Sequence, residues 1–201
     1  NEFTKNSLHA GQYYSPSPDF YLTQGNQFNQ ILSSYFPNKS KIIGSLKYDT
    51  YKFKIKKQSA KLNKIKLKNK NKKIILICPS IGDEIRILEY LKQSVNFNFR
   101  YILSPHPVLY NRRKRVIKKY FQELKNKCNL EVYNDISTFE LLSISNLVIC
   151  EVSTVAYEAL FFDTQSIRIV NSKYPIFFDP RDNLPVAHNP NKLRQLFNEK
   201  S

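Results

Sequence analysis

Strand-length apolar runs separated by helix-forming segments dominate the chain from residue 74 onward. These runs are Ile74–Cys78, Phe99–Leu103, Leu130–Tyr133, Leu147–Cys150 and Ser166–Val170. Strands that alternate with helices build right-handed βαβ units around a parallel sheet. The pattern therefore predicts an α/β fold, a Rossmann-like, mostly parallel sheet with flanking helices.

Helical signals fill the gaps between these runs. Arg112–Lys127 has apolar residues on one face and basic residues on the other, as expected of an amphipathic helix on a sheet. Ser137 and Glu140 have the spacing of a capping box, and Thr154–Phe162 follows a strand. We expect a helix at each of these places.

A lysine tract divides the chain into three parts. Residues 52–73 contain 11 lysines and no acid, and much of the formal charge of +16 is concentrated there. A tract without a convincing apolar face repels itself, so we interpret it as an exposed lysine-rich linker. Contact with an anionic membrane is the functional alternative for these lysines. Residues 74–201 then form the predicted α/β domain, and residues 1–51 precede the tract.

Residues 1–51 carry weaker structural signals. Phe28, Ile31, Leu32 and Phe36 recur at helical spacing, and the predicted helix should stop before Pro37. Lys41–Ser45 is interpreted as a strand followed by a turn. The first residue is Asn1, and we expect the chain to be part of a longer protein.

His106 is the first candidate site residue. It lies in Ser104-Pro105-His106-Pro107, directly after the second predicted strand, where a parallel sheet places its ligand-binding loops. Two prolines restrict the backbone around the imidazole, which could then donate to a phosphate or leaving-group oxygen. A simple turn is the alternative interpretation.

Ser153 and Thr154 are the second candidate pair, between a predicted buried strand and a helix. Hydroxyls and amide N–H groups at a helix start can bind phosphate, although ordinary N-capping uses the same residues. Glu158, one turn further, could face a ribose or solvent, and Ser80 follows the first strand as a further candidate for substrate binding.

Several classes of site are excluded by motif. With glycine only at positions 11, 25, 44 and 82, the chain has no glycine-rich phosphate loop, dinucleotide fingerprint or Walker sequence. The histidines and cysteines lack zinc-site spacing, so we expect neither a metal nor a cofactor. Three scattered cysteines fit a reducing cytosol better than a disulfide framework.

The two motifs carry a family resemblance. His106-Pro107 followed by Ser153-Thr154 resembles the HP and S/T motifs of bacterial sialyltransferases, polysialyltransferases and Kdo transferases of the GT-B type. The run Ile136–Val170 also resembles the phosphate-binding half of GT-B capsule enzymes and of glycerophosphotransferases that use CDP-glycerol. The resemblance extends weakly upstream through Leu8–Gly11, Tyr21–Gly25 and Ile42–Ser45.

The resemblance implies an activity. Residues 74–201 would be the nucleotide-binding domain, and residues 1–51 the end of an acceptor-side domain or an interdomain segment. The nucleotide-binding domain would bind a CMP-activated sugar such as sialic acid or Kdo, for transfer to a bacterial surface glycan. His106 would contact the phosphate and assist its departure, with Pro107 beside it, while Ser153 and Thr154 hold the same phosphate. His9 would be an acceptor-side residue.

Alternatives to this activity remain. CDP-glycerol or a UDP-sugar would be the other donors, and a basic nucleic-acid-binding protein using the lysine tract is the alternative outside enzymes. We expect no specific nucleic acid as partner. The expected location is the cytoplasm, with peripheral contact at the inner face of the membrane.

Overall fold

The computed structural model describes residues 19–23, 25–45, 49–50, 60–80, 84–106, 122–128, 130–151, 153–170 and 184–199. The chain divides into two compact units, Asn1–Lys57 and Gln58–Ser201. Each unit is built around its own parallel strand pairing, and the larger one contains the predicted nucleotide-binding domain.

The smaller unit contains one helix and two short strands. Helix α2 (Asn26–Tyr35) connects β1 (Tyr21–Thr23) to β2 (Ser40–Ile42), and the strands pair in parallel. Tyr21 stacks on Phe36, with ring centroids 4.7 Å apart. The predicted helix before Pro37 is confirmed, as is the strand at Ile42, while β1 was not predicted.

The larger unit is built on a six-stranded, fully parallel sheet with the order β5-β4-β3-β6-β7-β8. Its strands are β3 (Lys73–Cys78), β4 (Phe99–Leu103), β5 (Leu130–Val132), β6 (Leu147–Cys150), β7 (Gln165–Ile169) and β8 (Val186–Ala187). Strand β3 lies at the centre, with Ile75 paired to Tyr101 on one side and Leu147 on the other. The predicted Rossmann-like α/β fold is confirmed.

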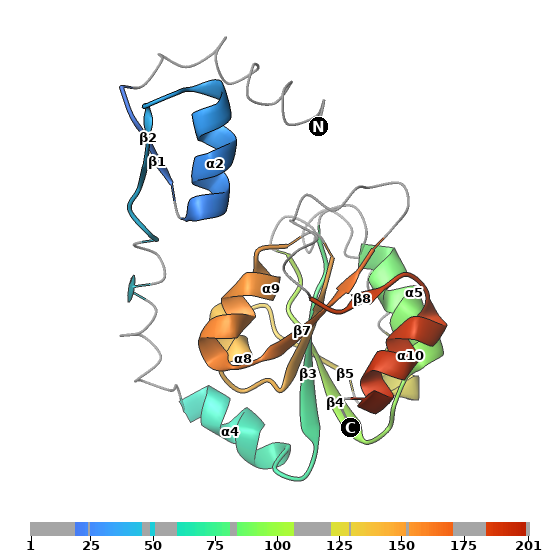
Figure 1. Ribbon diagram of the computed structural model, residues 1–201. Helices are drawn as coiled ribbons and strands as arrows, with labels where there is room; N and C mark the ends of the chain where they lie inside the picture. The colour runs from blue at the N-terminus through green and yellow to red at the C-terminus, as the bar shows by residue number, and fades with distance from the viewer. Residues whose placement is uncertain are drawn as a thin grey trace. The chain divides into compact units, whose positions relative to one another are not determined.

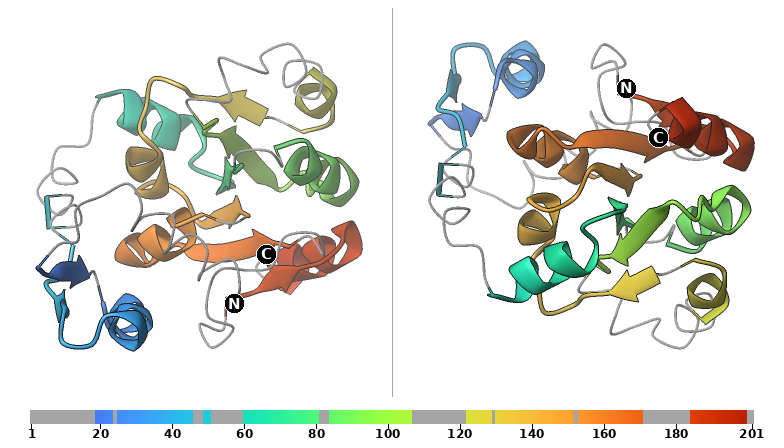
Figure 2. Two further views of the ribbon diagram at one scale, coloured as in Figure 1. Left: turned by 90° about the horizontal axis from the view of Figure 1, so that it is seen from above. Right: turned by 90° about the horizontal axis from the view of Figure 1, so that it is seen from below.

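Helices cover both faces of this sheet (Figures 1 and 2). On one face, α5 (Glu84–Ser94) and α10 (Pro190–Glu199) pack in a core that contains Ile75, Ile77 and Tyr101. On the other, α4 (Ala60–Lys68), α8 (Thr138–Leu142) and α9 (Val155–Glu158) share a core with Leu76 and Val148. Burial on both faces explains why β3, β4 and β6 are nearly continuous apolar runs.

Helix α4 corrects the prediction of an exposed linker over residues 52–73. Leu62 and Ile65 are 2% and 4% exposed and belong to the core under the sheet, so the linker prediction is wrong for residues 60–68. Their three-residue spacing puts both side chains on one side of the helix, while the lysines lie on the others. Residues 52–59 lie outside the described part of the chain.

Other predicted elements are present in the structure, although some begin or end at different residues. The capping box of Ser137 and Glu140 is present, with the Glu140 amide donating to Ser137 Oγ at 3.2 Å. The helix predicted over 154–162 is α9 followed by a 3₁₀ helix, Ala159–Phe162. Of the helix predicted over 112–127, only residues 122–127 are described, and they are helical. Strand β8 and helix α10 were not predicted.

The packing of α4 gives a stability prediction with an internal control. Leu62→Ala should lower the free energy of unfolding by about 2–5 kcal/mol, because it leaves a cavity beneath the sheet. Leu67, on the same helix but 72% exposed, is the matched control, and Leu67→Ala should change it by less than about 0.5 kcal/mol. Urea unfolding measures both, and equal effects would contradict the packed helix.

A charged network holds α4 to the outer strands. The Glu131 carboxylate on β5 accepts hydrogen bonds from Lys68 of α4, from Arg100 of β4 and, at 2.8 Å, from the Tyr133 hydroxyl. Burial alone would raise the pKa of Glu131, but these hydrogen bonds outweigh it, so the pKa is lowered from its usual 4.5. The ionised form is therefore the one that the fold stabilises.

This network makes the free energy of unfolding depend on pH. Because the pKa of Glu131 is lower in the folded state, ionised Glu131 stabilises the fold at any pH above 4.5. This contribution disappears as the pH falls through the folded-state pKa. Glu131→Gln should therefore be less stable than the parent at pH 7, with a difference that narrows below pH 4.5. Urea unfolding across this range measures it. Asp163→Asn, at an exposed turn, is the control, and a gap that does not narrow in acid would contradict the assignment.

Candidate functional site at the carboxyl edge of the sheet

The three loops that carry the predicted site residues leave neighbouring strands at the same edge. Because β4, β3 and β6 are adjacent and parallel, His106, Ser80 and Ser153 follow their carboxyl ends side by side. This is the edge at which open α/β sheets bind ligands. The structure therefore brings these predicted residues to one region of the larger unit.

His106 extends from a fixed base. The Ser104 amide donates to the Ile77 carbonyl at 3.0 Å, and the Ser104 hydroxyl lies 2.7 Å from that of Thr138 at the start of α8. Ser104 and Pro105 are buried, whereas His106 is half-buried. The loop thus anchors the backbone below the imidazole and leaves the ring within reach of solvent.

Glu151 joins the loops after β3 and β6. Its Oε2 atom accepts from the Ser80 amide at 3.2 Å, and the side chain is 4% exposed. A buried carboxylate is stable only with such partners. Ser80 is thereby tied through its backbone to the loop that carries Ser153 and Thr154, and the Ser80 side chain itself is half-buried.

Ser153 and Thr154 lie at the start of α9, where the predicted helix begins. The Val155 amide donates to Ser153 Oγ at 3.3 Å, a local turn contact, and Thr154, the N-cap residue of α9, makes no side-chain capping hydrogen bond. Thr154 Oγ1 donates to Glu158 Oε1 at 3.2 Å. Because Thr154 is exposed and Ser153 half-buried, both hydroxyls border solvent, and their contact with a phosphate stays a prediction.

Glu158 is 5% exposed, so the structure directs it inward rather than toward solvent. Its observed hydrogen bond orients Thr154, and contact with a ribose stays a prediction. His9 and Pro107, the remaining predicted site residues, lie outside the described part of the chain.

Arg168 is a buried charge at this edge that the sequence analysis missed. It is 2% exposed and pairs with Cys150 in the register of β7 and β6. Its Nη2 donates to the Tyr157 hydroxyl at 3.0 Å, and its guanidinium lies 5.2 Å from the centre of the Tyr157 ring. An arginine inside an apolar strand was the available signal, because such a charge needs a built environment.

Metal and membrane features were also sought in the described residues. Within the ranges given above, no group of three or more His, Cys, Asp or Glu side chains could hold a metal ion. None of the described helices is both long and apolar enough to cross a membrane.

Comparison with known proteins supports the fold. No protein-family model and no curated protein matches the chain. Among solved structures, this chain is similar to the wall teichoic acid polymerase TagF soaked with CDPG. The match covers 99% of this chain and 53% of the TagF chain, at 18% identity and a TM-score of 0.58. The match to S. aureus MnaA with UDP covers 90% of this chain and 50% of the MnaA chain, at 14% identity and a TM-score of 0.69.

A third structure extends the same pattern. The UDP-GlcNAc 2-epimerase of Methanocaldococcus jannaschii, in complex with UDP-GlcNAc and UDP, covers 90% of this chain and 54% of its own, at 15% identity and a TM-score of 0.62. At such identities the likeness shows a common fold. The chain spans about half the length of these structures.

Two cysteines lie directly below the candidate site. Cys78 and Cys150 are register partners at the ends of β3 and β6, and both are buried. Burial raises the pKa of Cys150 to about 12 and that of Cys78 well above its usual value. Since the thiolate is the nucleophile, these thiols do not suit nucleophilic catalysis.

Thiol labelling checks this assignment. At pH 8 the native protein should react negligibly with a disulfide reagent such as DTNB, because Cys78, Cys128 and Cys150 are all buried. In denaturant, the three cysteines of the chain should all react. Rapid labelling of the native state, mapped to Cys78 or Cys150 by mass spectrometry, would contradict the buried placement.

Proposed function

We propose that this chain is the nucleotide-donor-binding part of a GT-B glycosyltransferase or glycerophosphotransferase, and that it binds the donor's phosphates at the carboxyl edge of the sheet. The observation that carries the proposal is the convergence of His106, the Ser80 loop and Ser153–Thr154 at the ends of three adjacent parallel strands. The fold is shared with solved structures that hold UDP or were soaked with CDPG, which supports a pyrimidine nucleotide as ligand.

The proposed donor is a nucleoside diphosphate derivative, such as a UDP-sugar or CDP-glycerol. The CMP-activated sugar that the motif resemblance implies, with sialic acid or Kdo as the sugar, is the alternative donor. Both groups of donor present a phosphate that leaves or is attacked during transfer. The two motifs fit that shared chemistry, and the choice between the donors depends on contacts to base and sugar.

His106 is the proposed catalytic residue. In glycosyl transfer, the bond between the anomeric carbon and the phosphate oxygen breaks while the acceptor hydroxyl forms a new bond to that carbon. The phosphate gains negative charge in the transition state, and a positioned imidazole N–H can stabilise it. Ser153 would donate a hydroxyl hydrogen bond to the same group, and Thr154 would do so by turning its hydroxyl away from Glu158 Oε1, to which it donates in this structure. The acceptor proton would pass to a base outside the described residues.

The proposed setting is the cytoplasm, at the inner face of a bacterial membrane, with a surface glycan or its precursor as acceptor. The half-length match to the solved structures supports a donor domain that works with a second, acceptor-side domain. In this proposal neither a cofactor nor a metal takes part, because hydrogen-bond donors supply the charge stabilisation.

Calorimetry with matched nucleotides tests the phosphate site. The double variant Ser153→Ala, Thr154→Ala should weaken binding of UDP, CDP or CMP by about 10- to 100-fold, since a hydrogen bond to a charged group contributes about 1.5–3 kcal/mol. Binding of uridine or cytidine should change little, because nucleosides lack the phosphate. His106→Ala should show the same selectivity for phosphate.

Ser143→Ala, Ser145→Ala is the matched control, because these hydroxyls precede β6 at its amino end while Ser153 and Thr154 follow its carboxyl end. The control should bind nucleotides as the parent does. Absence of binding by all three nucleotides to the intact chain would overturn the proposal. Equal loss for nucleosides and nucleotides would place the phosphate elsewhere.

A further inference from the structure

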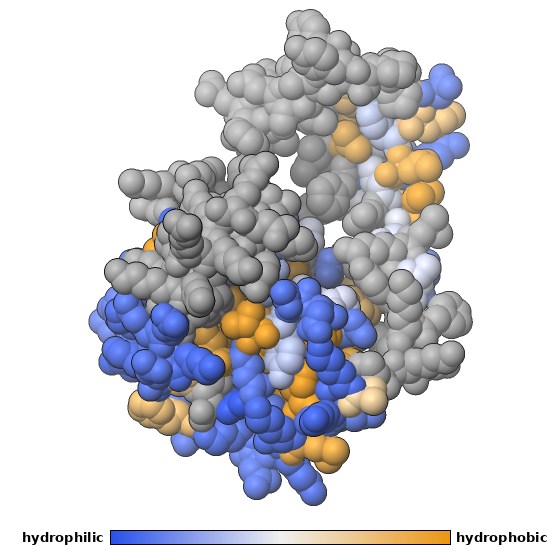
Figure 3. Space-filling model, turned by 180° about the vertical axis from the view of Figure 1, so that it is seen from behind, coloured by the Kyte–Doolittle hydropathy of each residue, from blue (hydrophilic) through white to orange (hydrophobic). Residues whose placement is uncertain are grey.

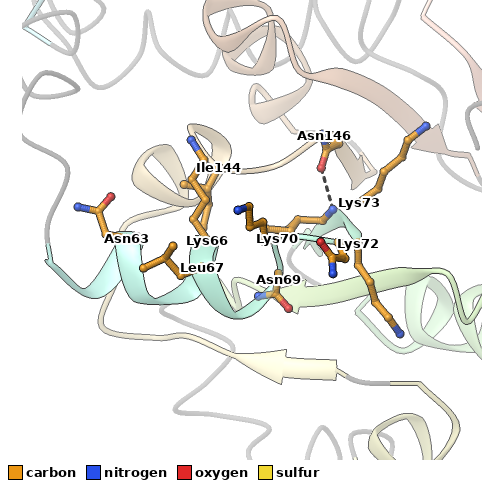
Figure 4. Close-up of a pocket in the computed structure, with 11 residues that line it drawn as sticks. Asn63, Lys66, Leu67, Asn69, Lys70, Lys72, Lys73, Ile144 and Asn146 are labelled. Atoms are coloured by element: carbon orange, nitrogen blue, oxygen red, sulfur yellow. Dashed lines mark hydrogen bonds between the residues drawn. The ribbon is translucent and has the colours of Figure 1, made fainter.

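The amino edge of the sheet, opposite the candidate site, carries a basic hollow. It has a volume of about 800 Å³ and lies between α4, the turn that follows it, the start of β3 and the loop before β6 (Figure 4). Lys66, Lys70, Lys72 and Lys73 line it, together with Leu67, Ile74, Ile144 and the asparagines 63, 69, 71 and 146. Among these lining residues there is no acidic side chain.

Part of the positive charge at this edge is not paired with any of the described acids. Two lysines of α4 are neutralised, since Lys61 pairs with Asp135 and Lys68 with Glu131. Within the described ranges, no ion pair involves Lys64, Lys66 or Lys70. Like charges gathered at one edge repel each other, so the fold tolerates a charge concentration here that an anionic partner would relieve.

Two large apolar side chains project from the same edge. Leu67 is 72% exposed and Phe97 is 71% exposed. The Lys72 ammonium donates to the Phe97 carbonyl at 3.1 Å, which joins the turn before β4 to the turn before β3. In Figure 3, hydrophobic side chains lie among the hydrophilic ones at this end of the larger unit.

We propose that this edge, called here the lysine edge and defined by Lys64, Lys66, Leu67, Lys70, Lys72, Lys73 and Phe97, docks on an anionic lipid bilayer. Lysines are attracted to anionic headgroups, and their aliphatic stems tolerate the interfacial region. Leu67 and Phe97 enter the boundary between headgroups and acyl chains, where apolar side chains leave water. The two kinds of contact reinforce each other because they lie on one edge.

The apolar residues favour lipid over other anions. A nucleic acid would satisfy the lysines through its phosphates but would leave Leu67 without an apolar partner. A free phosphate ion needs a closed set of donors, whereas these lysines are exposed along an open edge. A bilayer surface matches both the spread of the charge and the exposed side chains between the lysines.

Docking at this edge would keep the candidate site accessible. Strand β3 begins at Lys73 in the lysine edge and ends at Cys78, two residues before Ser80. A six-residue strand spans roughly 20 Å, so the carboxyl edge would lie away from the bilayer surface. A water-soluble ligand could then enter while the protein is bound to lipid. The lipid contact does not depend on the proposed donor.

Vesicle flotation of the full chain tests the proposal. The parent should bind vesicles of phosphatidylcholine with 30% phosphatidylglycerol and not vesicles of phosphatidylcholine alone. The triple variant Lys64→Gln, Lys66→Gln, Lys70→Gln should reduce binding on the order of 100-fold, because each lysine near an anionic surface contributes roughly one kilocalorie per mole. Leu67→Ser with Phe97→Ser should also weaken binding, at unchanged charge.

The matched control removes three lysines elsewhere, Lys39→Gln, Lys41→Gln and Lys192→Gln, of which two lie in the smaller unit and one at the start of α10. It should bind vesicles as the parent does. Substitution is preferable to deletion, because Leu62 and Ile65 of the same helix are core residues. Circular dichroism and urea unfolding verify that each variant is folded.

Three results would overturn the proposal. Equal loss in both triple variants would mean that total charge alone drives binding. Vesicle binding that survives loss of the lysine edge would place the membrane contact elsewhere. If the parent does not bind vesicles but binds duplex DNA or RNA, and the triple variant loses that binding, the edge would be assigned to nucleic acid. Nucleotide calorimetry on the same variants should be unchanged, so failure here and failure of the donor site are distinguishable.

Discussion

The pairing of β3 with β4 on one side and β6 on the other is the constraint on which the larger unit depends. A central parallel strand is buried on both faces, so it requires helices above and below and cannot alternate polar with apolar residues. Ile75 and Ile77 face one core while Ile74 and Leu76 face the other. Helix α4 follows from this requirement, since the second face would otherwise expose Ile74 and Leu76 to water.

The same pairing gathers the candidate site. Parallel strands end at one edge, so loops from distant parts of the sequence meet there without any contact being specified between them. Glu151 then fixes the relation of two of these loops through the Ser80 amide. Buried Arg168 donates to the hydroxyl of half-buried Tyr157, and this hydrogen bond joins β7 to α9. The edge is therefore a hydrogen-bonded base that carries partly exposed hydroxyl and imidazole side chains.

The sequence predicted those elements whose local pattern agrees with their tertiary role. Phe99–Leu103 and Leu147–Cys150 match residue for residue, because strands buried on both faces are nearly continuous apolar runs, with Arg100 as the one interruption in these two. The capping box of Ser137 and Glu140 was recognisable because its hydrogen bonds are local. The convergence of His106 and Ser153 could be predicted from topology alone, since any parallel sheet would bring their loops to one edge.

Most of the elements that were not predicted depend on tertiary contacts that the local sequence does not show. Helix α4 contains only two buried apolar residues among its lysines, and its packing depends on a sheet face that the local sequence does not show. Arg168 looks like a break in an apolar strand until Tyr157 is placed beside it. Strand β8 has two residues, too few for a periodicity. Helix α10 buries Leu193, Leu196 and Phe197 at helical spacing, a signal that was present but not used.

The lysine tract shows how one segment can serve packing and charge together. On a helix, residues three apart share a side, so Leu62 and Ile65 can contact the sheet while Lys64 between them does not. Glu131 and Asp135 neutralise the lysines nearest the outer strands, and this leaves the remaining charge at the amino edge. The charge therefore reflects where acids are placed as much as where lysines are. A helix that must cover the core thereby also contributes Lys64 and Lys66 to the charge of the amino edge, at the end of the sheet opposite the candidate site.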